Sequence, residues 1–162
     1  MILVSLGTQD FPFNRLLEKI DELIEKKVIQ EEVIAQTGYS SYVPRHFKYT
    51  KFTTFDEFED LLDQCRILIT HGGTGTIVGG LRKKKRIIAV PRLKKYAEHV
   101  DDHQTEIINL FSDKNFIIGL EDVSGLEQAL QAIETFEPID YVSGNQKIVS
   151  LIDNFLGRTV RN

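Results

Sequence analysis

The stretch from Ile67 to Thr76 constrains the fold most, because it joins a buried strand, a glycine loop and the start of a helix. Its first part, Ile67 to Thr70, is a short apolar run that ends near glycines, which is typical of a strand in a parallel sheet. The loop His71-Gly72-Gly73-Thr74-Gly75-Thr76 follows, and an apolar helical segment comes next. Parallel strands need helical crossovers, so this stretch predicts an α/β fold.

The same alternation of strand and helix patterns runs along the rest of the chain. Strands are expected at 2–6, 33–37, 47–52, 67–70, 86–91 and 116–118, and helices at 12–26, 55–62, 74–82, 103–111, 125–136 and 144–156. No internal repeat or linker interrupts the series. We therefore expect a single Rossmann-like domain over 1–156, with a parallel sheet of about six strands, helices on both faces and a frayed tail at 157–162.

Length and composition exclude several classes of protein. The 162 residues suit one domain with a sizeable core. The net charge of −4 argues against a general nucleic-acid binder, which is usually basic. The single cysteine, Cys65, rules out a disulfide framework, and its place before a buried strand indicates packing rather than nucleophilic catalysis. No apolar run approaches the roughly 20 residues that span a bilayer.

Two interpretations of the glycine loop are open from its spacing alone. Glycines let the backbone approach a ligand closely, and the next helix would turn its first N–H groups and positive dipole end toward a phosphate. Thr74 or Thr76 could cap that helix. His71 would lie at the carboxyl end of the strand, where ligands bind in open α/β sheets. The alternative is a tight turn that binds nothing, because the loop matches neither a P-loop nor a dinucleotide fingerprint.

A second polar segment, Ala97 to Glu106, is dense in hydrogen-bonding groups. Asp102, His103 and Gln104 stand at the start of an expected helix, where they could bind a polyhydroxylated ligand. The other interpretation is an N-cap by Asp101 or Asp102 on a solvated loop. Two histidines of the segment have the i, i+4 spacing of some zinc sites, but the H-E-x-x-H motif is missing, so we expect no metal.

A basic run, Arg82 to Arg86, also has two interpretations. It could place favourable charge at a helix C-terminus and in the solvated turn that follows. It could instead attract anionic lipid head groups, at about 1 kcal/mol for each basic residue near the surface. Arg92, Lys94 and Lys95 could extend such a patch.

Three motifs, taken together and in this order, resemble a known family. They are Thr70-His71-Gly72-Gly73-Thr74-Gly75-Thr76-Ile77, Val90-Pro91-Arg92 and Asp102-His103-Gln104-x-Glu106, and the opening Val4-Ser5-Leu6-Gly7-Thr8 also fits. Over essentially its whole length the chain resembles the carboxy-terminal, donor-binding half of the GT-B glycosyltransferases of family 28. It is most similar to the small soluble subunits of two-part transferases, which serve bacterial exopolysaccharide and capsule synthesis and the eukaryotic transfer of GlcNAc to a dolichol-linked sugar.

The resemblance implies a site for a nucleotide-sugar donor, usually a UDP-sugar, and no cofactor. In it, the diphosphate would face Gly7, Thr8, Gly72, Gly73, Thr74, Gly75 and Thr76, the uracil would lie near Phe52 and Thr53, and the sugar would meet Asp102, His103 and Gln104. Arg92 is assigned to the same site, and His71 would orient the donor phosphate or the reacting centre. Backbone N–H groups of the loop would stabilise the charge on the departing UDP.

By the same resemblance, the protein is the catalytic subunit of a two-component hexosyltransferase. It would move a hexose from a UDP-sugar to a lipid-diphosphate-linked sugar in polysaccharide synthesis. Single-chain relatives carry an amino-terminal domain with acceptor and membrane contacts, and here a membrane-anchored partner subunit would supply it. We expect a cytoplasmic protein that this partner recruits to the inner face of the membrane.

Gly79 departs from the family pattern. Related enzymes often carry at this position a glutamate that holds the ribose hydroxyls, so the ribose must be held otherwise here. Two alternatives stay open: a non-catalytic regulatory or scaffold subunit with the same fold, and another nucleotide-sugar-binding enzyme such as an epimerase. The segment Asp102-His103-Gln104 counts against the epimerase.

Overall fold

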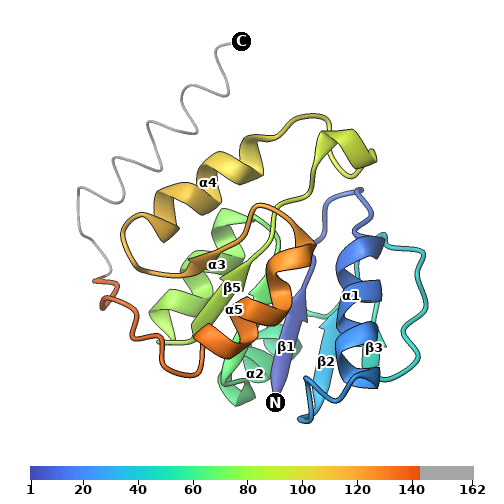
Figure 1. Cartoon of the computed structure of the whole chain (residues 1–162), viewed down its shortest axis with the longest axis horizontal. Coiled ribbons are helices and arrows are strands. Elements are labelled where there is room, and N and C mark those ends of the chain that lie inside the picture. The colour runs from blue at the N-terminus through green and yellow to red at the C-terminus, as the bar shows by residue number, and fades with distance from the viewer. Residues whose placement is uncertain (143–162) are drawn as a thin grey trace.

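A six-stranded parallel sheet forms the centre of the computed structural model, which describes residues 1–142 (Figure 1). The order across the sheet is β3-β2-β1-β4-β5-β6. The strands are β1 (Ile2–Ser5), β2 (Val33–Gln36), β3 (Lys48–Thr50), β4 (Ile67–Thr70), β5 (Arg86–Ala89) and β6 (Ile118–Gly119). Each neighbouring pair runs in parallel, as the alternating pattern predicts.

Helices connect the strands and cover the sheet. They are α1 (Asn14–Glu25), α2 (Phe55–Gln64), α3 (Thr74–Arg82), α4 (His103–Ser112) and α5 (Leu126–Ala132), with short 3₁₀ turns η1 (Lys94–Tyr96) and η2 (Val123–Gly125). Thr54 and Glu57 begin α2 with a reciprocal capping box, in which each side chain accepts a backbone N–H of the other residue. Local sequence signals therefore set the start of this helix.

Two apolar clusters, one on each face of the sheet, form the core. Ile2 and Val4 of β1 belong to the cluster that includes α1 and α5. Leu3, between them, belongs to the cluster that includes α2, α3 and α4. Because successive strand residues point to opposite faces and both faces are covered, β1 and β4 are buried along their whole length. The expected Rossmann-like domain with helices on both faces is confirmed.

The strand order creates a switch point between β1 and β4. From β1 the chain proceeds outward to β2 and β3, and from β4 it proceeds in the opposite direction to β5 and β6. The loops that leave β1 and β4 at their carboxyl ends therefore diverge. Open α/β sheets bind their ligands in the crevice that such divergence leaves.

Some element bounds differ from the sequence prediction. α1 begins at Asn14 rather than 12, because the backbone of Phe13, the N-cap residue, is not helical (φ −146°, ψ 56°). β6 begins at Ile118, since the backbone N–H of Phe116 donates to the carbonyl oxygen of Phe111 at 3.1 Å and not to the neighbouring strand. α5 ends at Ala132 rather than 136. The helix expected at 144–156 and the tail at 157–162 lie outside the described residues.

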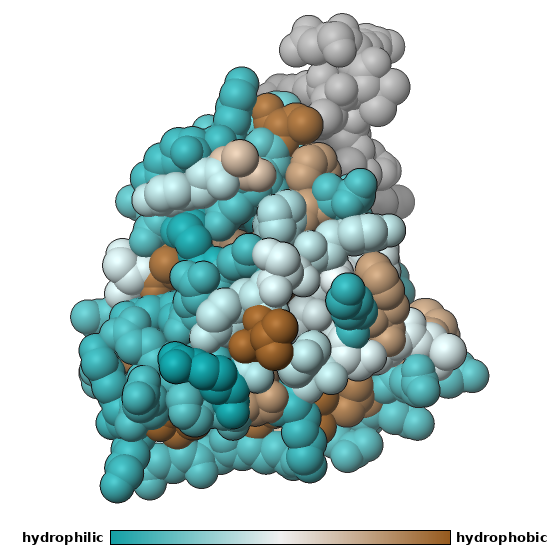
Figure 2. Space-filling model, turned by 90° about the vertical axis from the view of Figure 1, so that its right-hand side faces the viewer, coloured by the Kyte–Doolittle hydropathy of each residue, from teal (hydrophilic) through white to brown (hydrophobic). Residues whose placement is uncertain are grey.

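The surface is mostly polar on the side that carries α1 and β3. Figure 2 shows this side as largely hydrophilic, broken by separate hydrophobic side chains. Exposed apolar and aromatic side chains in the described part are Tyr39, Val43, Tyr49, Phe52, Phe55, Tyr96, Val100, Ile139 and Val142. Within residues 1–142, no helix has both the length and the apolar character needed to cross a bilayer.

Candidate functional site

A pocket of about 430 Å³ lies at the carboxyl ends of β1 and β4. Three segments line it: the loop after β1, the glycine loop with the first turn of α3, and the start of α4 with the residues before it. Its lining consists of Gly7, Thr8, Gln9, His71, Gly72, Gly73, Thr74, Gly75, Thr76, His99, Asp101, His103, Gln104 and Ile107. The topology thus gathers the separate sequence motifs at the switch point.

A second pocket of about 300 Å³ adjoins the first. The two share Gly7, Thr8 and Thr76. The second pocket is otherwise lined by Ser5, Gln36, Thr53, Thr54, Phe55 and Phe58. Both volumes fall in the range of small-molecule sites, which is roughly 300–1,000 Å³. Together they form an extended site with polar and glycine residues at its middle and aromatic residues at one end.

The His71 imidazole lies between two glycines from different loops. A Cβ atom added at Gly7 would stand 2.7 Å from Cε1 of His71, and one added at Gly73 would stand 2.6 Å from Nε2. Gly7 also has a φ of +71°, which side chains rarely tolerate. Both glycines are therefore required for the ring to fit, and the ring in turn sets the spacing between the two loops.

His71 is held neutral. Its side chain is 5% exposed. Burial, followed by the nearby positive charge of Arg92, lowers the pKa of His71 to about 3, although the carbonyl of Ser5 favours the charged form. Nδ1 lies 3.4 Å from the Ser5 carbonyl oxygen, which can only accept a hydrogen bond. This places the proton on Nδ1 and leaves the lone pair on Nε2, beside the two glycines.

Gln104 joins the glycine loop to the start of α4. A Cβ atom at Gly72 would stand 2.7 Å from Cβ of Gln104, so the two backbones approach closely. The side-chain oxygen of Gln104 accepts hydrogen bonds from the backbone N–H groups of Gly72, at 3.4 Å, and Arg92, at 3.0 Å. The carbonyl end of Gln104 is therefore occupied by the protein, and only its NH₂ group remains for a ligand.

The first turn of α3 forms one wall of the larger pocket. Residues Thr74 to Thr76 line it, so the first backbone N–H groups and the positive end of the helix dipole lie at this wall. The expectation that Thr74 or Thr76 caps the helix is wrong. The helix already begins at Thr74, with Gly73 as the N-cap, and no side chain in the described part bonds to this cap. An anion could take the place of that missing cap.

Three residues that the resemblance assigns to the site line neither pocket. Phe52 is half-exposed and packs edge-on against Tyr39, with ring centroids 5.3 Å apart. Asp102 accepts a hydrogen bond from the backbone N–H of Lys94 at 2.8 Å. Arg92 is fully buried beneath the loop after β1. Asp102 is the N-cap residue of α4, but its side chain makes no capping hydrogen bond, and Oδ1 of the preceding Asp101 accepts the backbone N–H of His103 at 3.1 Å.

The sequence prediction missed His99 and Asp101 as pocket residues. Nδ1 of His99 lies 3.1 Å from Oδ1 of Asp101, and the imidazole packs on the Phe11 ring with centroids 4.5 Å apart. Asp101 and His103 also approach each other, at 3.8 Å. The alternation His99-x-Asp101-x-His103 is the signal that could have indicated them. Among residues 1–142, however, no group of three or more His, Cys, Asp or Glu side chains could hold a metal ion.

The basic run lies at the opposite edge of the sheet, where the strands begin, and most of it is engaged in internal contacts. Lys83 pairs with Glu59 and Asp63. Lys85 donates to the backbone carbonyls of residues 63 and 65, and Arg86 donates to that of residue 134. Of the two interpretations of the run, the structure favours the local structural one.

Comparison with known proteins identifies the family. The family model for the glycosyltransferase family 28 C-terminal domain matches residues 1–147. A search of curated protein sequences found no match. Among solved structures, the NMR structure of ALG13 superposes with a TM-score of 0.61 at 20% identity, covering 93% of each chain.

Larger glycosyltransferases share the fold with part of their length. The glycosyltransferase of kitacinnamycin matches with a TM-score of 0.58 at 17% identity, over 83% of this chain and 34% of its own. SnogD from Streptomyces nogalater matches with a TM-score of 0.54 at 19% identity, over 93% of this chain and 42% of its own. These likenesses show the fold, the carboxy-terminal half of the GT-B plan, and the family model shows that the chain belongs to the glycosyltransferase family 28 C-terminal domain family.

Proposed function

We propose that the chain binds the UDP-sugar donor of a two-component glycosyltransferase and catalyses transfer of its hexose to a lipid-diphosphate-linked sugar. The observation that carries the proposal is the pair of adjoining pockets at the switch point. The loop after β1 and the first turn of α3 lie where the two pockets meet. The diphosphate would lie at Gly7, Thr8 and Thr76, which both pockets share. The nucleoside would take the smaller pocket and the hexose the larger one.

The walls of the larger pocket suit the leaving group of such a reaction. In the transfer, the acceptor oxygen attacks the anomeric carbon, the bond from that carbon to the β-phosphate oxygen breaks, and UDP departs with added negative charge. Preorganised N–H groups at the start of α3 would stabilise that charge. Because His71 is neutral, it would contribute through the spacing of the two loops and through hydrogen bonding rather than as a cation.

The hexose would meet the wall formed by the start of α4. Gln104 offers its NH₂ group there, and His103 and Asp101 also line the pocket. Hydroxyl groups of a sugar pair well with such mixed donors and acceptors. Arg92, Asp102 and Phe52 would act from outside the two pockets, by holding the loops that form them.

A partner subunit would supply the acceptor site and the base of the reaction. Family resemblance favours a membrane-anchored subunit that binds the lipid-linked acceptor, takes the proton from its hydroxyl and recruits this chain to the inner face of the membrane, in exopolysaccharide or capsule synthesis. A scaffold subunit that has lost turnover is the alternative that Gly79 favours. A Cβ atom there would meet one atom within 4 Å, of Leu62, and the glycine offers no group to the ribose.

Calorimetric titration with UDP, UDP-galactose and UDP-GlcNAc tests the donor site. We expect wild type to bind at least one of them, and His71→Ala to bind it at least tenfold more weakly. Lys84→Ala, at the opposite edge of the sheet, is the control and should bind as wild type does. A transfer assay on membranes with and without the co-expressed partner then tests turnover. No binding to any of the three, alone or with the partner, would favour the scaffold.

A further inference from the structure

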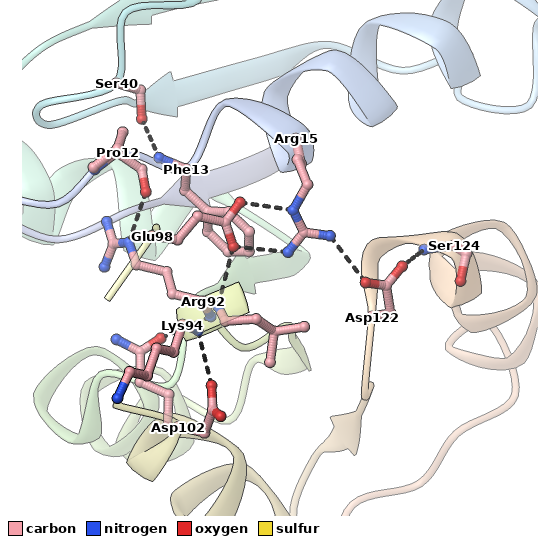
Figure 3. Close-up of polar contacts among 12 residues, drawn as sticks. Pro12, Phe13, Arg15, Ser40, Arg92, Lys94, Glu98, Asp102, Asp122 and Ser124 are labelled. Atoms are coloured by element: carbon pink, nitrogen blue, oxygen red, sulfur yellow. Dashed lines mark hydrogen bonds and ion pairs between the residues drawn. The ribbon is translucent and has the colours of Figure 1, made fainter. Parts of the chain in front are cut away.

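Arg92 is a buried cation that holds both ends of the loop after β1. Its Nη2 donates to the carbonyl oxygens of Leu6, at 2.7 Å, and Phe11, at 3.1 Å. Its Nε donates to the carbonyl oxygen of Pro12 at 3.4 Å (Figure 3). Leu6 and Phe11 flank the segment 7–10, whose residues Gly7 to Gln9 line the pocket. One guanidinium therefore holds the two ends of this loop together.

The backbone of Arg92 takes part in the same arrangement. Its N–H donates to Oε1 of Gln104 at 3.0 Å, and the same oxygen accepts the N–H of Gly72 at 3.4 Å. Arg92 and Gln104 therefore connect the three walls of the larger pocket: the loop after β1, the glycine loop and the start of α4. Gln104 lines the pocket, whereas Arg92 is fully buried and acts from beneath it.

The charge of Arg92 is not cancelled by a direct ion pair. Its side chain is fully buried and donates to the backbone carbonyls described above, and Nη1 has no hydrogen-bond partner among residues 1–142. The nearby carboxylate of Glu98 is held instead by Arg15, through two contacts of 2.7 Å (Figure 3). Burial lowers the pKa of Arg92 to about 10, so it stays charged near neutral pH.

A buried cation without a paired carboxylate is costly, and an apolar side chain could fill the same volume at less cost. Carbonyl oxygens at both ends of the loop account for the guanidinium shape, since its fork donates in several directions at once. The guanidinium is always charged, and the neutral carbonyls leave that charge without a paired carboxylate and Nη1 without a hydrogen bond among residues 1–142. An anionic ligand above the loop would account for the charge.

We propose that Arg92 is a positioning residue for the diphosphate: it holds the Gly7–Gln9 loop closed and places a positive charge beneath it without touching the donor. The proposal rests on the proposed donor site. It separates Arg92 from the residues that line the pockets, and it predicts an effect that depends on the charge of the ligand. A purely structural role would weaken all ligands alike.

The test compares UDP with uridine as probes in calorimetric titrations of wild type, Arg92→Met and Arg92→Lys. Arg92→Met should lose at least tenfold in affinity for UDP and less than twofold for uridine, because uridine lacks the diphosphate. Arg92→Lys keeps the charge and should lose less than Arg92→Met. Arg86→Met, which removes the same charge at the opposite edge of the sheet, is the matched control and should match wild type for both probes. Equal losses for UDP and uridine, or no loss for UDP, would overturn the proposal.

Amide hydrogen exchange of Leu6 and Phe11, whose N–H groups donate to the carbonyl oxygens of Gln36 at 3.0 Å and Gln9 at 2.8 Å, provides a readout that needs no ligand. Exchange of these amides should accelerate at least tenfold in Arg92→Met, and unchanged exchange would overturn the claim that Arg92 closes the loop. If Arg92→Met does not fold, the UDP-to-uridine ratio and the exchange rates of Arg92→Lys decide. If wild type binds neither UDP nor uridine, the proposed donor site fails, and the exchange rates still decide whether Arg92 holds the loop.

Discussion

The two edges of the sheet differ in how their polar groups are satisfied. At the amino edge, where β1, β4 and β5 begin, charged side chains satisfy one another. The carboxylate of Glu31 pairs with the chain's amino group at 2.9 Å and with Arg66, which also pairs with Glu134 at 2.8 Å. At the carboxyl edge, glycines replace side chains, the α3 cap lacks a side-chain partner in the described part, and two pockets open.

The difference shows how one fold separates stability from binding. Polar groups that are already paired gain nothing from a ligand, whereas backbone N–H groups left open at a helix start gain a hydrogen bond when an anion arrives. The close packing of His71 against Gly7 and Gly73 keeps the open edge rigid. Substitutions at the carboxyl edge should therefore affect both binding and stability, and substitutions at the amino edge should affect stability alone.

The largest effect is expected at the glycines that clamp His71. Gly7→Ala adds a Cβ atom 2.7 Å from the ring and puts a side chain at a φ of +71°. Together, overpacking and left-handed strain should lower the free energy of unfolding by about 2–4 kcal/mol. Chemical denaturation measures the change. Gly75→Ala is the matched control, because nothing lies within 4 Å of a Cβ there, and it should not destabilise. Similar losses of stability in both variants would contradict the close packing of His71 against Gly7.

The second effect is a pH dependence of stability. The pKa of His71 is lowered to about 3 in the folded protein, against about 6.5 in the unfolded chain. The unfolded chain therefore binds more protons between these values, so the stability contributed by neutral His71 is complete above pH 6.5 and is lost as the pH falls. The slope should be up to about 1.4 kcal/mol per pH unit between pH 6 and 4.

His71→Gln isolates this contribution, because glutamine does not titrate. Denaturation curves at several pH values should show a smaller slope between pH 6 and 4 in the variant than in wild type. The pKa of the Asp21 carboxyl is also lowered, by hydrogen bonds from Arg45, Tyr42 and His46 that outweigh its burial. Its contribution is lost at lower pH, below its unfolded value of about 3.9. Identical slopes in the two proteins would mean that His71 titrates normally.

A smaller effect is expected at the amino edge. Glu31→Gln removes the charge that pairs with Arg66 and with the chain's amino group. These groups are partly exposed, so the loss of stability should be about 1 kcal/mol or less and should shrink in high salt. UDP affinity should not change. A loss of UDP affinity in this variant would contradict the claim that substitutions at the amino edge affect stability alone.

The smallest effect is expected at Gly79, inside α3. A Cβ atom there would have ordinary van der Waals contact with Leu62 at 3.9 Å and no closer neighbour. Because glycine is unfavourable in a helix interior, Gly79→Ala should raise the free energy of unfolding by about 0.5 kcal/mol. Thermal and chemical denaturation together can resolve a change of this size. Destabilisation instead would contradict the open surroundings of Gly79.

Much of the fold was predictable because it depends on local patterns. The run Ile67–Thr70 and the glycines after it are enough to indicate a strand, a turn and a helix, and the alternation of such units indicates a parallel sheet. The position of His71 at the carboxyl edge follows from that topology alone. Strand ends were less predictable. Phe116 and Ile117 look like strand residues, but they pack into the core before the strand begins.

The finer layout of the site depends on contacts between distant residues, which a sequence pattern does not encode. His99 reaches the pocket because the segment before it turns at Ala97, with a φ of +56°, and because Glu98 is held by Arg15 of α1. Arg92 follows a strand of the site, yet it turns under the neighbouring loop to bind the carbonyls of Leu6 and Phe11. Spacing indicates which loops converge, and the buried partners decide which side chains face the ligand.

The most direct test of the central claim is to map where UDP binds by backbone amide chemical shifts in NMR spectra of the chain. We predict that titration with UDP shifts the amides of residues 7–9 and 72–76, while the amides at the starts of β1, β4 and β5 stay unchanged. No shifts at the carboxyl edge, or shifts confined to the amino edge, would contradict the claim that the switch point holds the nucleotide.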